Sequence, residues 1–325
     1  MAALAALAAA PAAAQTDPLR DSLLAMRALD ARVATVGHRL AVGSRDLCPV
    51  RQWLPGFAVH DLSAYNGDYR PAAIRAFGFG ADPAVLAVVP GSSAERAGLR
   101  PDDAISRVDG AAFDAVTGLT PGQSGDQTER ILDAIESAFA DGAAVMEVRR
   151  AGAPLSLRVE AEQGCPTRFQ VVPARGHDAH ADGRYVQITT PLASYVADDD
   201  ELAAVLAHEF AHNVLGHRAR LDAAGVSRGV LANFGRNARL IRQTEVEADR
   251  LSVYLLDRAG YDPEAAVRFW SRFRGHGLNF LGSATHGSPG RRLALLRAEI
   301  ALIRQARAAG QVATPPVAAP PRAGG

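Results

Sequence analysis

The chain of 325 residues lacks several features that define whole classes of protein. It contains no lysine, and its 35 basic residues are balanced by 35 acidic ones. A balanced chain has no long-range field to attract nucleic acid, which argues against a dedicated nucleic-acid binder. Two cysteines are too few for a disulfide scaffold or a zinc site made of thiolates. No internal run reaches the ~18 consecutive apolar residues that a membrane-spanning helix needs, so we predict no transmembrane segment in the mature chain.

The composition is otherwise that of a folded globular protein. Hydrophobic residues make up 48% of the chain, which is enough to bury a full core and excludes wholesale disorder. The length favours about two domains.

The two ends of the chain differ in composition from the rest. Residues 1–15 form a short apolar run that ends in Ala12-Ala13-Ala14, a small-x-small pattern typical of signal-peptidase sites. We therefore predict a signal peptide and a periplasmic or secreted protein. No arginine precedes the apolar run, so the true start could lie upstream, and an alanine-rich disordered start is the alternative. Residues 311–325 are rich in proline, alanine and glycine and are predicted to be a disordered tail that cannot pack.

Hydrophobic periodicity divides the rest of the chain into three parts. A helix is predicted from Asp17 to about Ser44, with Asp17 as its N-cap and Pro18 in its first turn. Short strands and turns follow, with a helix over 131–139 and a loop over 113–127. From residue 185 a strand is followed by predicted helices at about 199–220, 243–259, 263–274 and 289–308.

The strand-rich part resembles a PDZ domain of bacterial envelope proteases. Residues 88–110 predict a strand, a short helix closed by Gly98, a tight turn and a second strand ended by Asp109-Gly110. Asp102 stands where that family usually has glycine. The resemblance implies a PDZ domain at 56–163, inserted between an N-terminal peptidase helix at 17–50 and a peptidase domain at 168–310.

PDZ domains bind a peptide as an added strand, with backbone N–H groups receiving its terminal carboxylate. The loop that matches this receptor is Phe77-Gly78-Phe79, and the alternative is a bulge in the core. Cys48 and Cys165 flank the insert, and each is followed by proline. In an oxidising compartment a disulfide between them would clamp the two ends of the insert; two unrelated buried thiols are the alternative.

The strongest chemical signal is an HExxH motif formed by His208, Glu209 and His212. The two histidines lie one helical turn apart, so both imidazoles can reach one ion, and zinc suits such a site. Glu209 can take a proton from the attacking water. A chance match in an alanine-rich helix is the alternative, although a buried helix that carries charged residues usually pairs them or gives them a metal.

A third ligand is available in Thr244–Arg250. Glu245 and Glu247 point about 200° apart on a helix, so only one of them can face the metal. Asp249 lies one turn after Glu245, which favours Glu245 as the ligand and Asp249 as the acceptor for an imidazole N–H. Glu247 is then expected to be solvated.

These residues resemble the zinc metallopeptidase family that contains the CAAX prenyl proteases and the HtpX heat-shock proteases, metallopeptidase family forty-eight. Its HExxH and ExxxD motifs are matched by His208, Glu209, His212, Glu245 and Asp249. The resemblance covers about 182–307. It implies an α+β fold: a mainly helical peptidase domain with a small edge sheet, one zinc ion per chain, and polypeptide substrates.

The same resemblance implies roles for other residues. His286 and Arg292 stand where the family has a histidine and an arginine near the cleft, but Gly287 replaces a proline. We predict that His286 stabilises the oxyanion or covers the open metal position; a helix-capping histidine is the alternative. Arg292 is predicted to contact substrate. His217 is expected to be a structural residue at the helix end, because its spacing from the motif differs from that of a third histidine ligand.

Two further segments have alternative interpretations. The loop with His177 and His180 could form a second metal cluster, but it matches the family's edge segment, in which Ala179 and Ala181 would pair with extended substrate. Residues 228–242 interleave arginines with apolar residues, a pattern compatible with peripheral membrane contact and more typical of an amphipathic flap.

The sequence thus predicts a zinc metalloendopeptidase that acts on envelope proteins, misfolded ones above all, with a PDZ domain for capture or regulation. A PDZ peptide-binding or chaperone-like module with a vestigial or latent zinc site is the alternative, and an aminopeptidase is a third. The intact Glu209 argues against a vestigial or latent zinc site. The lack of a visible site for a free amine argues against an aminopeptidase.

Overall fold

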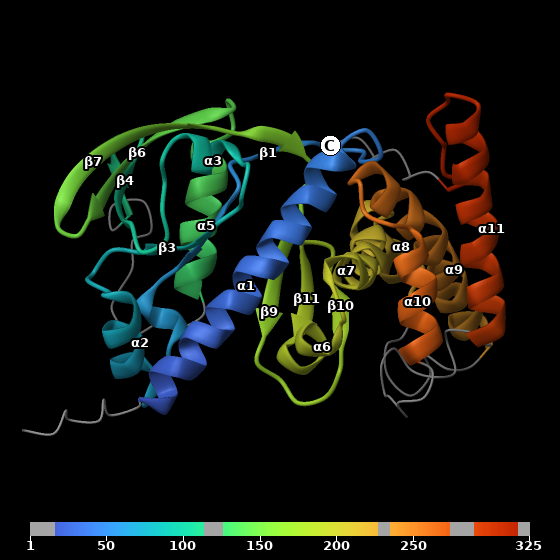
Figure 1. Cartoon of the computed structure of the whole chain (residues 1–325), viewed down its shortest axis with the longest axis horizontal. Helices are drawn as coiled ribbons and strands as arrows, with labels where there is room; N and C mark the ends of the chain where they lie inside the picture. Colours follow the sequence, from blue (N-terminus) through green and yellow to red (C-terminus); the bar gives the residue numbers. More distant parts are fainter. Residues whose placement is uncertain (1–16, 114–125, 227–234, 274–288, 318–325) are drawn as a thin grey trace, which may run out of the picture.

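The computed structural model describes residues 17–113, 126–226, 235–273 and 289–317. A long helix, α1 (Pro18–Gly43), runs diagonally between a strand-rich part and a mainly helical part (Figure 1). The fold is mixed helix and sheet, as the sequence predicted for the α+β class.

Helix α1 has the start and the apolar stripe that the sequence predicted. The Asp17 side chain caps it by accepting a hydrogen bond from the Arg20 backbone N–H at 3.2 Å. Its buried face includes Leu23 near the start and Val33, Val36 and Leu40 farther along. Because these residues recur at helical spacing, α1 presents one continuous apolar face to both halves of the molecule.

The strand-rich part contains a six-stranded sheet in the order β2-β3-β4-β6-β7, with β5 added to β4. The strands are β2 (Phe57–His60), β3 (Ala84–Val88), β4 (Ala104–Val108), β5 (Ala111–Ala112), β6 (Ala143–Arg150) and β7 (Ala153–Glu160). The helical elements here are η1 (Leu62–Ala64), α2 (Tyr69–Phe77), α3 (Ser93–Arg96) and α5 (Asp126–Ala138). Ile131 and Phe139 in and after α5 pack with Met146 and Val148 of β6 in a core of their own. Most of the loop predicted at 113–127 lies outside the described residues.

Helix α1 also packs against this strand-rich part. Leu23 joins Phe77 and Phe79 in a small buried cluster, and Arg27 pairs with Asp102 at 2.6 Å. Asp102 has a φ of 67°, in the left-handed region that favours glycine. That conformation explains why glycine is usual at this turn, and the Arg27 contact gives the aspartate here a partner.

A two-stranded ribbon joins the strand-rich part to the rest of the chain. Strands β1 (Gln52–Leu54) and β8 (Glu162–Gly164) pair antiparallel, so the chain leaves and returns at one place. Next to this ribbon Cys48 and Cys165 form a disulfide, with Cα atoms 5.7 Å apart. The intervening segment is therefore tied at both ends, by backbone pairing and by a covalent bond.

The mainly helical part contains a three-stranded sheet in the order β10-β11-β9. Strands β9 (Arg168–Val172) and β11 (Tyr185–Thr189) are parallel, and β10 (Ala179–Ala181) is antiparallel to β11. The helices are α6 (Thr190–Tyr195), α7 (Asp199–Val214), α8 (His217–Ala223), α9 (Gly235–Arg258), α10 (Glu264–Phe273) and α11 (Pro289–Ala308). Helix α7 is surrounded by α1, α9, α10 and the sheet. No helix of the described segments combines the length and apolar character that crossing a bilayer requires.

The tail predicted from residue 311 is described up to residue 317, and part of it packs against the rest of the chain. Ala313 is buried against the helical core, and Arg258 donates a hydrogen bond to its carbonyl at 2.9 Å. A short apolar segment can pack without secondary structure when a side chain satisfies its backbone carbonyl, as Arg258 does here. The predicted signal peptide at 1–15 lies outside the described residues.

We expect the disulfide to contribute strongly to stability, since it closes a loop across a sequence separation of 117. Replacing both cysteines by serine should lower the free energy of unfolding by roughly 4–5 kcal/mol, because the unfolded chain regains the entropy of that loop. Urea denaturation of the double variant and of the wild type measures the loss. An unchanged midpoint, with the wild type confirmed to be oxidised, would contradict this expectation.

Candidate metal centre

Helix α7 carries the HExxH residues through the middle of the core. Asp198 caps it by accepting from the Glu201 N–H at 2.8 Å, and Glu201 in turn accepts from the Ala197 N–H at 3.0 Å. The helix is apolar on nearly every face, as expected of a helix enclosed by others. His208 and Glu209 are 1% and 2% exposed, so both polar side chains are held away from bulk water.

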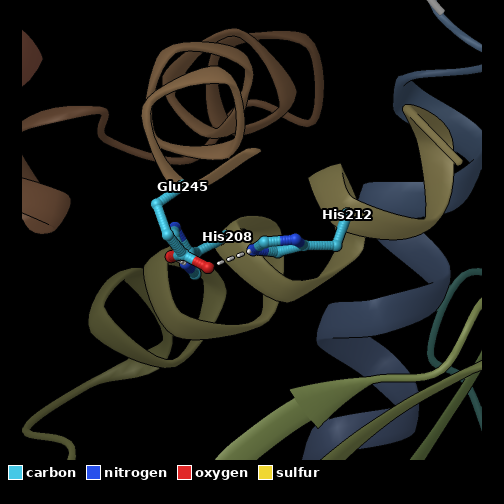
Figure 2. Close-up of side chains that lie close together, drawn as sticks. All are labelled: His208, His212 and Glu245. Atoms are coloured by element: carbon cyan, nitrogen blue, oxygen red, sulfur yellow. Dashed lines mark ion pairs between the residues drawn. The ribbon is translucent and has the colours of Figure 1, made fainter. Parts of the chain in front are cut away.

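Helix α9 brings the acidic side chain that the sequence favoured. Glu245 lies opposite both histidines, with its carboxylate oxygens 3.3 Å from His208 Nε2 and 3.6 Å from His212 Nε2 (Figure 2). The candidate donor atoms of the three residues all lie within 4.8 Å of one another, and no other group of this kind occurs among the described residues. Two helices distant in sequence thus bring together two imidazoles and one carboxylate.

The far nitrogen of His208 is held by an acidic partner. Asp249, one turn after Glu245, lies 3.0 Å from His208 Nδ1. Arg292 donates to Asp249 at 2.5 Å, and its guanidinium lies 3.3 Å from the centroid of the Trp270 ring. Burial alone lowers the pKa of His208, but Asp249 and Glu245 outweigh it and raise that pKa to about 9. Asp249 therefore fixes the ring with Nε2 directed at Glu245.

Arg292, for which a substrate contact was predicted, lies next to His208, with its Nη2 3.1 Å from His208 Nδ1. Its side chain is buried, at 9% exposure, between Asp249 and Trp270. Arg292 is on α11, which packs on α9, the helix that carries Asp249. This packing places Arg292 behind His208. The contacts of Arg292 therefore orient Asp249.

The far nitrogen of His212 is held by a chain of two residues. His217 Nδ1 lies 2.9 Å from His212 Nδ1, and His217 Nε2 lies 3.1 Å from Glu247. A carboxylate accepts only, so His217 donates to Glu247 and offers its other nitrogen as acceptor. His212 then donates from Nδ1, which leaves the lone pair of Nε2 facing Glu245.

The prediction that Glu247 is solvated is therefore wrong. Its carboxylate is bound by His217, by Arg220 at 2.7 Å and by Gln243 at 2.9 Å, and its side chain is 17% exposed. The hydrogen bond with His217 and the contacts with Arg220 lower the pKa of Glu247 to about 2. The sequence placed Glu247 away from Glu245 on α9, but it gave no sign that α8 would bring His217 and Arg220 to it.

Glu209 is buried beside the first histidine and retains an unsatisfied oxygen. Its Oε1 has no hydrogen-bond partner, and the same is true of His212 Nε2. Burial raises the pKa of the Glu209 carboxyl to about 8, and burial lowers that of His212 to about 3. A carboxyl with a pKa near neutrality can both take and return a proton, which is what acid–base catalysis requires.

These features fit a divalent metal ion. Two imidazoles, which are neutral when they bind a metal, and a carboxylate are a donor set that zinc accepts while keeping a fourth position open. The buried, unsatisfied Nε2 of His212 points at the same space as His208 and Glu245. Buried polar atoms without partners are costly unless something binds them, and an ion would satisfy them here.

The edge segment predicted from the sequence lies next to α7. Ala179 and Ala181 belong to β10, the outer strand of its sheet. Asn213, at the end of α7, accepts from the Gly183 N–H at 2.7 Å and donates to the Tyr185 carbonyl at 3.1 Å. No role was predicted for Asn213, which fixes this edge against the HExxH helix. His180 is exposed and His177 contacts Tyr195, and neither joins a second metal cluster within the part of the chain that the structure describes.

The remaining predicted residues lie away from the metal centre or outside the described residues. Phe77 and Phe79 are buried against the rings of His60 and Tyr65, and Gly78 ends α2 with a φ of 67°. The two aromatic side chains therefore occupy a core cluster, and Gly78 lies at the end of a helix and not in a β-bulge. His286 and residues 228–234 lie outside the described residues, while Arg236, Arg239 and Arg242 are exposed on the first turns of α9.

A model of peptidase family M48 matches residues 147–241 and 230–300. This region therefore has the sequence pattern of a family M48 metallopeptidase. The predicted resemblance to the family is confirmed for these residues. Two curated relatives are mitochondrial metalloendopeptidases named OMA1. The relative from Schizosaccharomyces pombe is 34% identical over 29% of this chain and 35% of its own length. The relative from Saccharomyces cerevisiae is 27% identical over 34% of this chain and 39% of its own length. The matches thus span under two fifths of either relative.

We expect His217 to raise the affinity of the site for metal. Replacing His217 by alanine should weaken zinc binding about 10- to 100-fold, because His212 loses the acceptor that fixes its tautomer. Competition with a chromophoric chelator measures the affinity. His180→Ala, an exposed histidine on β10, is the matched control and should bind zinc as the wild type does. Equal zinc affinity in the wild type and the His217 variant would show that the contact between His217 and His212 has no effect on metal binding.

Proposed function

We propose that the chain is a zinc-dependent metalloendopeptidase. The observation that carries this proposal is the meeting of His208, His212 and Glu245 within 4.8 Å, with the buried carboxyl of Glu209 on the same helix. The match to a metallopeptidase family over 147–300 and the similarity to two metalloendopeptidases support it.

The side chains have distinct roles in peptide-bond hydrolysis. His208, His212 and Glu245 would hold a zinc ion, which would act as a Lewis acid by lowering the pKa of water and polarising the scissile carbonyl. Glu209 takes a proton from the attacking water and later gives it to the leaving amine. Asp249, Arg292, His217 and Glu247 hold the two imidazoles in the orientation described above.

Extended polypeptides suit the surroundings of the site better than free amino termini. Among the described strands β10 pairs only with β11, and it packs against α7, so a substrate backbone can pair with its other edge beside the metal centre. This placement favours an endopeptidase over an aminopeptidase. Protection of β10 amides from hydrogen exchange by a substrate peptide would distinguish this arrangement from one without strand pairing.

The finer predictions form part of the same proposal. We infer a soluble-type relative of the CAAX prenyl and HtpX group, located in the periplasm or secreted, that degrades misfolded envelope proteins. Its segment 56–163 would act as a PDZ domain that captures polypeptides. The disulfide supports an oxidising compartment. His286 remains a predicted oxyanion contact, and peripheral membrane contact by the arginines of α9 remains a prediction.

The rival proposal is a peptide-binding module whose metal site is vestigial. It is disfavoured by Glu209, since a metal site kept only for structure has no need of a buried carboxyl with an unsatisfied oxygen.

Glu209→Gln provides the decisive test of catalysis. Glutamine keeps the shape but cannot take a proton, so hydrolysis of a quenched fluorescent peptide should fall by at least about 100-fold. Zinc content should remain near one ion per chain, because Glu209 is not a ligand in the proposal. Glu247→Gln is a matched control, expected to affect metal affinity more than turnover of the loaded enzyme. Equal turnover by wild type and Glu209→Gln would end the peptidase proposal.

A further inference from the structure

A cavity of about 650 Å³ lies between the two parts of the molecule, away from the metal centre. Its walls come from β2 and α5 of the strand-rich part and from α1 and β9 of the other part. In Figure 1, α5 and β9 lie on either side of α1. The volume falls within the range of about 300–1,000 Å³ that is common for ligand-binding sites.

Two strand edges border this cavity. Strand β2 is the outermost strand of the six-stranded sheet, and β9 is the outermost strand of the three-stranded sheet. Among the described strands, β2 pairs only with β3 and β9 only with β11. An exposed strand edge presents unpaired N–H and C=O groups and can accept an extended peptide as a further strand.

The side chains that line the cavity are mainly apolar. Leu132 and Ile135 come from α5, Met26 from α1, and Phe169 and Val171 from β9. Such walls would bury the apolar side chains of an added strand, while the edge of β2 would receive its backbone.

Most of the ionisable groups at the cavity already have partners or are neutral. Arg168 binds three acids of α5: Glu129 at 2.9 Å, Asp133 at 2.6 Å and Glu136 at 2.6 Å. Burial lowers the pKa of His60 to about 3 and also lowers that of His38, so neither imidazole supplies a positive charge.

Asp30 is the exception. It lines the cavity from α1 and accepts a hydrogen bond from the Val171 backbone, but no described cation forms an ion pair with it. Burial raises the pKa of the Asp30 carboxyl to about 7, because the charged form is poorly solvated there. A positive group entering the cavity would gain a charge-assisted hydrogen bond with this carboxylate.

We propose that this cavity binds an extended polypeptide segment that adds to the edge of β2 and places an arginine or lysine side chain against Asp30. The inference rests on the proposal that segment 56–163 captures polypeptides, and it specifies the chemistry of what is captured. It also assigns part of the recognition to α1 and β9, which lie outside that segment.

The test uses the full chain with Glu209→Gln, so that probe peptides are not cut. Two fluorescein-labelled heptapeptides serve as probes, Val-Ser-Val-Arg-Val-Ser-Val and the same sequence with glutamine in place of arginine. Fluorescence anisotropy gives the two dissociation constants. We expect the arginine peptide to bind about three- to tenfold more tightly. Adding Asp30→Asn should remove this preference and leave the affinity for the glutamine peptide unchanged, which also shows that the variant is folded.

Asp21→Asn is the matched control, because Asp21 is exposed on the same helix and does not line the cavity. It should keep the full preference for arginine. Hydrogen exchange should show protection of residues 57–60 by the arginine peptide, which locates the peptide on β2.

Three outcomes would overturn the proposal. Equal binding of the two peptides, or a preference that survives Asp30→Asn, would exclude Asp30 as the receptor. Protection of β10 in place of β2 would show that the peptide binds only at the metal centre. Binding of neither peptide would overturn capture by segment 56–163 as well, while the loss of hydrolysis in Glu209→Gln would still stand as an independent test of the peptidase.

Discussion

The packing of α9 against α7 is the contact on which the metal centre depends. His208 and His212 share one face of α7 because they are four residues apart, but a third donor must come from elsewhere in the chain. The packing places Glu245 at 3.3 and 3.6 Å from the two ring nitrogens and Asp249, one turn later, behind the first ring. Because all of these groups are largely buried, each must be satisfied by a neighbour or an ion.

The two histidines depend on further residues that hold their rings in place. His208 is held by a carboxylate on the helix that also supplies Glu245, whereas His212 is held through His217 by a carboxylate on the opposite face of the same helix. Asp249 and Glu247 are only two residues apart, yet they orient different rings, because successive side chains on α9 point in different directions. One helix thus supplies the candidate ligand Glu245 and both orienting carboxylates.

Local patterns in the sequence were sufficient for some of these features. The HExxH spacing, the 200° separation of Glu245 from Glu247 and the stripe of α1 follow from helical geometry, so α7, α9 and α1 could be predicted from residues alone. The hydrogen bonds of Glu247 and Asn213 and the burial of Arg292 and Ala313 depend on which elements meet in three dimensions. Periodicity gives the buried face of an element but not its neighbour, so these contacts could not be predicted.

The three-stranded sheet relates the metal centre to the cavity. Its strand β10 borders α7, while β9, at the opposite edge, lines the cavity, and β11 lies between them. Neighbouring strands are about 4.8 Å apart, so the two edges are separated by only about 10 Å of sheet. A polypeptide on β2 would therefore lie across this sheet from the metal centre and could not itself be the strand paired with β10. Capture and cleavage would engage different stretches of a substrate, and the chain between them would have to pass around the sheet or around α1.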